Sequence, residues 1–126
     1  MNIRKSKLGV TLLSLLLLSA GPQANSAVEF SLSPAHSFEP ASVTFKIVVN
    51  APNTEQVCLM FSDVAGNYER TSCWPHRADI KRWRPVISNI PAGEYNSLAV
   101  ITVRGEGGIR TEHRSVVREF SVLAKG

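Results

Sequence analysis

The stretch YNSLAVITV, residues 95–103, decides the fold class, because no other part of the chain favours a β-strand so strongly. It is rich in β-branched residues and largely apolar on both faces, which is typical of a strand at the centre of a sheet. Turn residues bound it on both sides: Pro91 to Gly93 precede it, and the hairpin sequence GEGG, residues 105–108, follows it. The sequence therefore predicts that residues 95–103 form a central β-strand.

Outward from this stretch, apolar and polar residues alternate as half-buried strands require. In residues 43–49 the apolar positions share one face, and Thr44 and Lys46 point to the other. The same reading predicts about seven strands, at residues 28–32, 43–49, 57–61, 67–74, 86–87, 95–103 and 114–123. The segment between Pro34 and Pro40 is expected to be a loop, and no helical pattern follows residue 27. Short strands at this spacing predict an all-β, antiparallel β-sandwich.

The first 27 residues have the three regions of a secretory signal peptide: a positively charged start, an apolar run from Leu8 to Ala20, and small residues up to Ala27. The apolar run is 13 residues long, whereas a membrane-spanning helix needs about 20. We therefore expect a cleavable signal peptide at residues 1–27 and a single domain at residues 28–126. The mature protein is expected to have no membrane anchor and to be exported to the periplasm or the medium.

The charge of the mature domain is close to neutral. The whole chain has 14 basic and 10 acidic side chains, a formal net charge of +4. Arg4, Lys5 and Lys7 lie in the predicted signal peptide, so 11 basic side chains remain against the same 10 acids. Nucleic-acid binders usually have a strongly basic domain. We therefore expect no nucleic-acid partner.

The chain has two cysteines, Cys58 and Cys73, and both lie in the mature part. An even number of cysteines in an exported protein favours a disulfide, with two free buried thiols as the alternative. If Cys58 faces Cys73 in an antiparallel hairpin, the same register pairs Asp63 with Tyr68 around a turn. The predicted disulfide would then link two adjacent strands of one hairpin and would not join two sheets.

Residues 90–108, IPAGEYNSLAVITVRGEGG, resemble the late strands of bacterial immunoglobulin-like domains. The likeness extends over residues 29–123 and implies an immunoglobulin-like sandwich that serves as an exported adhesion or spacer module. It also implies that Tyr95 acts as the tyrosine-corner residue of that fold. Antibody-type domains would have a cysteine two residues later, where this chain has Ser97, so that branch of the fold is excluded.

A second resemblance is to small immunoglobulin-like inhibitors of cysteine proteases, which have a Gly-rich loop and an Arg-Pro loop. This chain has GEGG at residues 105–108 and the pair Arg84-Pro85, but in the reverse order. The likeness implies an inhibitor that acts on a protein partner.

The sequence gives no catalytic arrangement. It lacks a Gly-x-Ser-x-Gly motif, and His36, His76 and His113 are scattered through polar segments without metal-ligand spacing. The GEGG sequence lacks the lysine and following helix of a phosphate-binding loop. We therefore expect a protein that is not an enzyme and that has no cofactor and no metal site.

The segment CWPHRADIKRWRP, residues 73–85, is the least strand-like part of the mature chain. In one interpretation its tryptophans pack into the edge of the sandwich and its charges are solvated. In the other it is a cationic, aromatic loop suited to anionic or carbohydrate ligands. The candidate binding residues are Trp74, Arg77, Lys81, Arg82, Trp83 and Arg84.

These observations predict an exported, non-enzymatic binding or adhesion module of the bacterial immunoglobulin-like type. The alternative is a small accessory or inhibitor protein that acts on a protein partner through an edge strand or through the loop at residues 74–84.

Overall fold

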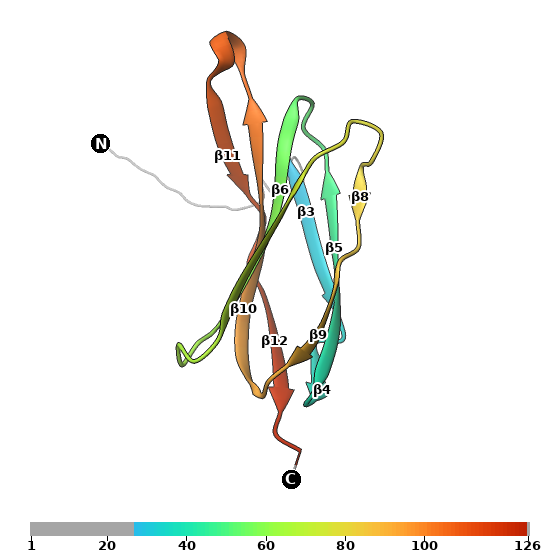
Figure 1. Cartoon of the computed structure of the whole chain (residues 1–126), viewed down its shortest axis with the longest axis vertical. Helices are drawn as coiled ribbons and strands as arrows, with labels where there is room; N and C mark the ends of the chain where they lie inside the picture. Colours follow the sequence, from blue (N-terminus) through green and yellow to red (C-terminus); the bar gives the residue numbers. More distant parts are fainter. Residues whose placement is uncertain (1–26, 126) are drawn as a thin grey trace, which may run out of the picture.

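The computed structural model describes residues 27–125. The predicted signal peptide, residues 1–27, lies outside this part of the chain except for its last residue. Residues 27–125 form an all-β sandwich of ten strands in two sheets, with one 3-10 turn at Glu106–Gly108 (Figure 1). This confirms the predicted fold class. Within the described residues, no helix has the length and apolar character needed to span a membrane.

The larger sheet has β10 (Gly93–Arg104) at its centre, as the sequence predicts. Its path across the sheet is β4 (His36–Phe38), β12 (Arg118–Leu123), β10, β6 (Thr54–Asp63) and β7 (Glu69–Pro75). A further strand, β11 (Arg110–Arg114), pairs with the far end of β10. All neighbours are antiparallel except β4 and β12, which are parallel.

The smaller sheet consists of β3 (Val28–Ser33), β5 (Ala41–Val49), β8 (Arg82–Trp83) and β9 (Val86–Ile90). Strands β8 and β9 lie one after the other along the same side of β5. Trp83 faces Ile47, and Val86 faces Thr44, in one continuous register. The smaller sheet is therefore three strands wide, whereas the path across the larger sheet contains five strands.

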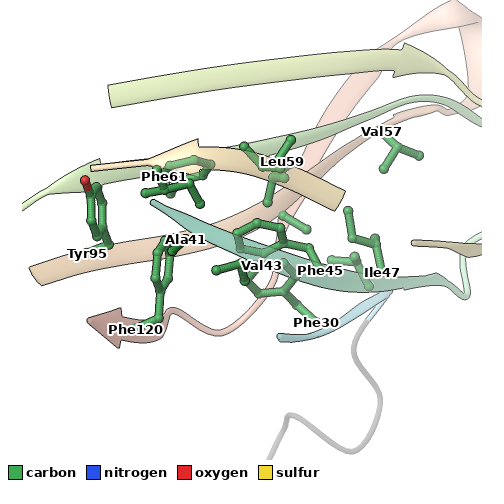
Figure 2. Packing of buried hydrophobic residues seen from close by; sticks show 14 of the residues in the cluster. Phe30, Ala41, Val43, Phe45, Ile47, Val57, Leu59, Phe61, Tyr95 and Phe120 are labelled. Carbon is green, nitrogen blue, oxygen red and sulfur yellow. The ribbon is translucent and has the colours of Figure 1, made fainter. Parts of the chain in front are cut away.

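The core lies between the two sheets and is formed by the apolar face of each alternating strand (Figure 2). On β5 the predicted inward residues are buried, while Thr44 and Lys46 are exposed on the outer face. At the centre of the core the Phe45 ring stacks against Phe61 with ring centroids 5.6 Å apart and meets Phe120 edge-on. Stacked and edge-on aromatic pairs add to the stabilisation that burial provides.

Three short strands were not predicted: β4, β8 and β11. Strand β4 lies in the segment expected to be a loop, and it pairs in parallel with β12. Strand β8 pairs with β5 inside the segment that has the weakest strand pattern. Strands this short have little local signal, because their stability comes from the neighbour that they join.

The predicted strand at residues 114–123 is also wrong at its start. Strand β11 ends at Arg114 and β12 begins at Arg118, because residues 115–117 form an irregularity that shifts the pairing with β10 by one residue. The side chain of Ser115 fills the gap in the ladder: its hydroxyl accepts a hydrogen bond from the backbone N–H of Ala99, 2.9 Å away. The same hydroxyl donates to the carbonyl of Val116.

Candidate functional site

The two sheets differ in width, and this leaves one side of the sandwich open. Strand β7 is the terminal strand of the larger sheet, beyond β6. Its residues Arg70, Ser72 and Trp74 face buried positions of β6 and therefore point to the inner side of the sheet. A groove runs along this side between β7 and the edge formed by β8 and β9. Arg70, Ser72 and Trp74 line one wall, and Trp83 and Arg84 line the other.

The two tryptophans of residues 73–85 close one part of this opening. Trp74 belongs to the larger sheet and Trp83 to the smaller one, and their rings stack with centroids 6.2 Å apart and an interplanar angle of 22°. Both side chains are partly buried and pack against the core. Their placement agrees with the interpretation in which the tryptophans pack into the edge of the sandwich.

A hydrogen bond holds the indole of Trp83 in place. Its Nε1–H donates to Nδ1 of His76, 3.3 Å away, and the two rings lie at a tilt of 45°. Burial lowers the pKa of His76, and the carboxylate of Asp79 opposes that shift. A lowered pKa favours the neutral imidazole, which is the form that accepts this bond.

The four cations of the candidate site separate into different environments. Arg77 forms an exposed ion pair with Asp79, with 3.2 Å between Nη2 and Oδ2. Lys81 is exposed and lines a second hollow, together with residues 49–54. Arg82 and Arg84 flank Trp83 in sequence. Because Trp83 points inward, strand alternation directs Arg82 to the outer side of the smaller sheet. Arg84 comes just after β8, at the edge of this sheet, where it also lines the groove.

One further cation, Lys46 of β5, is not part of the predicted binding segment but lies beside these arginines. Arg84 lies between β8 and β9, and continuing the register of these two strands on β5 sets it level with Lys46. Arg82 faces Val48, two positions along β5. Like charges directly opposite each other on neighbouring strands are destabilising. The alternation of residues 43–49 already put Lys46 on the outer face, but its neighbour across the sheet depends on the pairing of distant segments.

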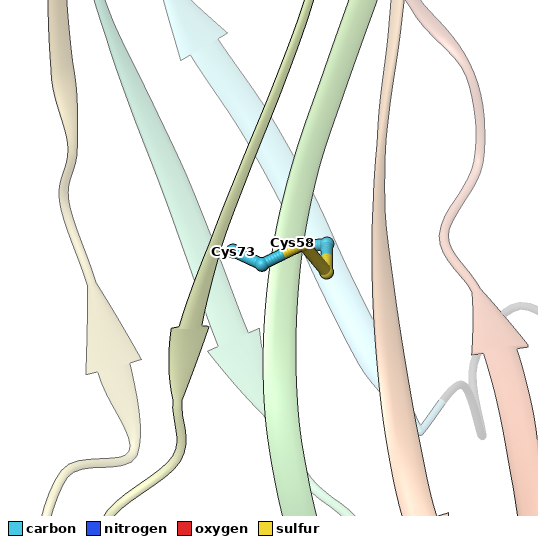
Figure 3. The surroundings of a disulfide bond; sticks show 2 residues. All are labelled: Cys58 and Cys73. Atoms are coloured by element: carbon cyan, nitrogen blue, oxygen red, sulfur yellow. A yellow bond between two sulfur atoms is a disulfide. The ribbon is translucent and has the colours of Figure 1, made fainter.

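The disulfide joins Cys58 of β6 to Cys73 of β7 (Figure 3). The two residues face each other with their Cα atoms 4.1 Å apart. The turn follows the predicted register too, since the N–H of Asp63 donates to the carbonyl of Tyr68. The bond therefore links adjacent strands of one hairpin, as predicted. A disulfide of this kind is typical of proteins from oxidising, exported environments.

The histidines do not converge. His36 hydrogen-bonds to Ser121, with 2.8 Å between Nδ1 and Oγ, whereas His76 lies beside Trp83 and His113 is exposed on β11. The contact between His36 and Ser121 has the form of a base and a hydroxyl nucleophile. Within residues 27–125, however, no carboxylate hydrogen-bonds to His36, so the group that would orient a catalytic base is missing. The same part of the chain contains no cluster of three or more potential metal-ligating side chains.

Comparison with known proteins gives no family assignment: no family model matches the chain, and no curated protein has a significantly similar sequence.

Proposed function

We propose that this protein is an exported, non-enzymatic binding module of the immunoglobulin-like type, and that its ligand is anionic. The observation that carries the proposal is the placement of Arg82 and Arg84. Both are exposed, and neither takes part in an ion pair within residues 27–125. An exposed guanidinium without an acidic neighbour is free to pair with a carboxylate, sulfate or phosphate of a ligand.

The anchoring of the segment supports this proposal. Trp83 lies between the two arginines in sequence, and its stacking on Trp74 and its hydrogen bond to His76 hold it against the sandwich. Cations attached to a fixed strand lose less conformational freedom on binding than cations on a mobile loop. Export is supported by the disulfide and by the predicted signal peptide.

The test is a double variant, Arg82→Ser with Arg84→Ser, compared with the mature wild-type protein. Both proteins are passed over immobilised alginate, sulfated dextran and neutral dextran. The wild type should be retained on the anionic matrices, less so as salt rises, and should pass through the neutral one. The double variant should lose this retention. Its free energy of unfolding should change little, because exposed charges contribute only about 0–1 kcal/mol.

The matched control is Arg114→Ser with Lys125→Ser, which also removes two positive charges, but from exposed positions elsewhere in the protein. Retention of the control should be close to that of the wild type. Equal losses in the two double variants would mean that net charge alone causes retention, and the proposed site would be wrong. Chemical turnover of the retained ligand would contradict the non-enzymatic assignment.

A second candidate function is an accessory or inhibitor protein whose partner adds a strand to the open side of the sandwich. The N–H of Phe45 donates to the carbonyl of Pro85, so the backbone of Pro85 points to β5. Along an antiparallel strand, successive residues direct their backbone groups alternately toward and away from the neighbouring strand. Arg84 and Val86, on either side of Pro85, therefore direct their N–H groups away from β5, to the open edge. Such an edge can accept an extended segment.

The amide of Val86 distinguishes the two candidates. Its hydrogen exchange should slow markedly when a protein partner pairs with this edge. A polysaccharide that contacts only side chains should leave the exchange rate nearly unchanged.

A further inference from the structure

The outer face of the smaller sheet brings together cations from distant parts of the sequence. Between the printed pairs of β8 and β9 with β5, the register continues through the hydrogen bond from the N–H of Phe45 to the carbonyl of Pro85, and this sets Arg84 level with Lys46. Arg82, in β8, faces Val48. On the other side of β5, Lys46 faces Ser31 of β3. Neighbouring strands lie about 5 Å apart, and alternate residues along one strand about 7 Å apart. The three cations therefore form a compact group on a flat face.

One acidic side chain shares this face with the three cations. On the outward positions of β3, β5, β8 and β9 the single acid is Glu29, and the side-chain amide of Asn50 donates a 2.7 Å hydrogen bond to it. No ion pair in residues 27–125 involves Lys46, Arg82 or Arg84. Their mutual repulsion costs stability, and a polyanion lying across the face would remove that cost.

The rest of the face is rich in hydroxyl groups and continues into a hollow. Two apolar side chains, Val48 and Val86, lie next to the cations. Other outward positions of these strands carry small hydroxyl side chains: Ser31, Ser33, Ser42, Thr44 and Ser88. Beyond Ser31, a hollow is lined by Lys46, Arg118 and the acidic Glu29. The guanidinium of Arg118 is held there by its hydrogen bond to the carbonyl of Phe30. The cations thus extend from β8 across the sheet to the far side of β3.

We infer that this face, with Lys46, Arg82 and Arg84 at its centre, binds a linear anionic polysaccharide. The inference rests on the proposed function, which supplies export and an anionic ligand, and it adds the class of ligand and the residue Lys46. Several cations at separations of about 5–7 Å match repeated charges along a polymer better than one small anion. Hydroxyl side chains can donate to and accept from sugar hydroxyls. Aromatic side chains, on which nucleic-acid bases would stack, are absent from the outward positions of these four strands.

The experiment compares Lys46→Ser with wild type, using oligogalacturonates of increasing length as the probe. Galacturonate monomer, neutral dextran and single-stranded DNA are measured in parallel at physiological salt. Arg114→Ser is the matched control, because it removes one exposed cation from β11 in the other sheet. Lys46→Arg restores the charge with a different side chain.

We expect affinity to rise with oligomer length, with weak or no binding of the monomer. Lys46→Ser should weaken binding of the long oligomers roughly three- to fivefold, the effect of losing one exposed ion pair. Arg114→Ser should stay within about twofold of wild type, and Lys46→Arg should recover most of the loss.

Other outcomes separate this inference from the proposed function. If Lys46→Ser has no effect while Arg82→Ser with Arg84→Ser abolishes binding, the ligand does not lie across the outer face at Lys46. The inference is then wrong, but the proposed function remains supported. Monomer binding as tight as oligomer binding would overturn the polymer assignment. Equal or tighter binding of DNA would overturn the polysaccharide assignment. If the wild type binds none of the anionic probes and is not retained on alginate or sulfated dextran, both proposals fail.

Discussion

The phenolic hydroxyl of Tyr95 donates a hydrogen bond of 2.7 Å to the backbone carbonyl of Pro91, four residues earlier. This bond ties the turn before β10 to the start of that strand. The ring of Tyr95 is buried and stacks on Phe120 with centroids 4.8 Å apart. The geometry is that of a tyrosine corner, which is the role that the resemblance to immunoglobulin-like domains implies for this residue.

Replacing Tyr95 with Phe should lower the free energy of unfolding by about 1 kcal/mol at neutral pH, since one hydrogen bond is lost and the ring is kept. Burial, with help from the negative charge of Asp63, raises the pKa of Tyr95 from 10 to about 12. The unfolded chain therefore loses this proton at a lower pH than the folded protein does. The protonated hydroxyl contributes fully to the free energy of unfolding below pH 10, and this contribution is lost as pH rises towards 12. Urea unfolding between pH 8 and 12 should show a steeper decline for wild type than for Tyr95→Phe. If the free energy of unfolding declines equally with pH in both proteins, ionisation of the Tyr95 hydroxyl does not affect stability.

The disulfide between Cys58 and Cys73 should leave no free thiol in the denatured, unreduced mature protein. Thiol titration measures this directly, and a result of two thiols would contradict the bridge. The cysteines are 15 residues apart, and closing a loop of that size stabilises by about 3 kcal/mol in the chain-entropy model. Cys58→Ser with Cys73→Ser should therefore lower the free energy of unfolding by about this amount, as measured by urea denaturation.

Changing Trp83 to Ala separates a packing role from a direct binding role. Replacing a fully buried tryptophan with alanine lowers the free energy of unfolding by about 3–5 kcal/mol. Because Trp83 is only partly buried, we expect a loss of about 2–3 kcal/mol. Trp83→Phe retains a ring that can stack on Trp74 and should cost less. Urea unfolding followed by circular dichroism measures both variants. Unchanged stability together with lost ligand binding would instead make Trp83 a binding platform.

His76 should make stability sensitive to mild acid. Burial holds its folded-state pKa below the ordinary value of 6.5, so the unfolded chain takes up a proton more readily than the folded one. The stability from neutral His76 is present above pH 6.5 and is lost as pH falls from there through the lowered folded-state pKa. His76→Gln keeps an acceptor for Trp83 and does not titrate, so its free energy of unfolding should depend less on pH between 8 and 5. If the free energy of unfolding depends on pH equally in both proteins, titration of His76 is not the cause.

The hydroxyl of Ser115 should contribute to the stability of the fold, although the residues next to it in the chain are exposed. It accepts from the N–H of Ala99, a residue with no exposed surface. Ser115→Ala leaves that buried N–H without its partner, which costs about 1–3 kcal/mol. Ser115→Thr keeps the hydroxyl and should be close to wild type. A negligible loss in Ser115→Ala, measured by urea denaturation, would mean that another group takes over the bond.

The sequence by itself determined where the long strands lie and, for β5, which residues face inward. The alternation over residues 43–49 and the apolar run over residues 95–103 correspond to β5 and β10, because side chains of a strand alternate whatever its neighbours are. The expectation that Cys58 faces Cys73 likewise predicted the register of their hairpin, because one facing pair sets every other pair of an antiparallel hairpin.

Only the tertiary structure decided the composition of the candidate site. Trp74 and Trp83 come from different sheets, and their stacking depends on how those sheets close against each other. Lys46 becomes a neighbour of Arg84 through a pairing between segments nearly 40 residues apart in the chain. Local periodicity fixes the face on which a side chain lies, because it is a property of one strand. The neighbours across a sheet depend on which strands pair and in what register, and the packing of the whole core selects that arrangement.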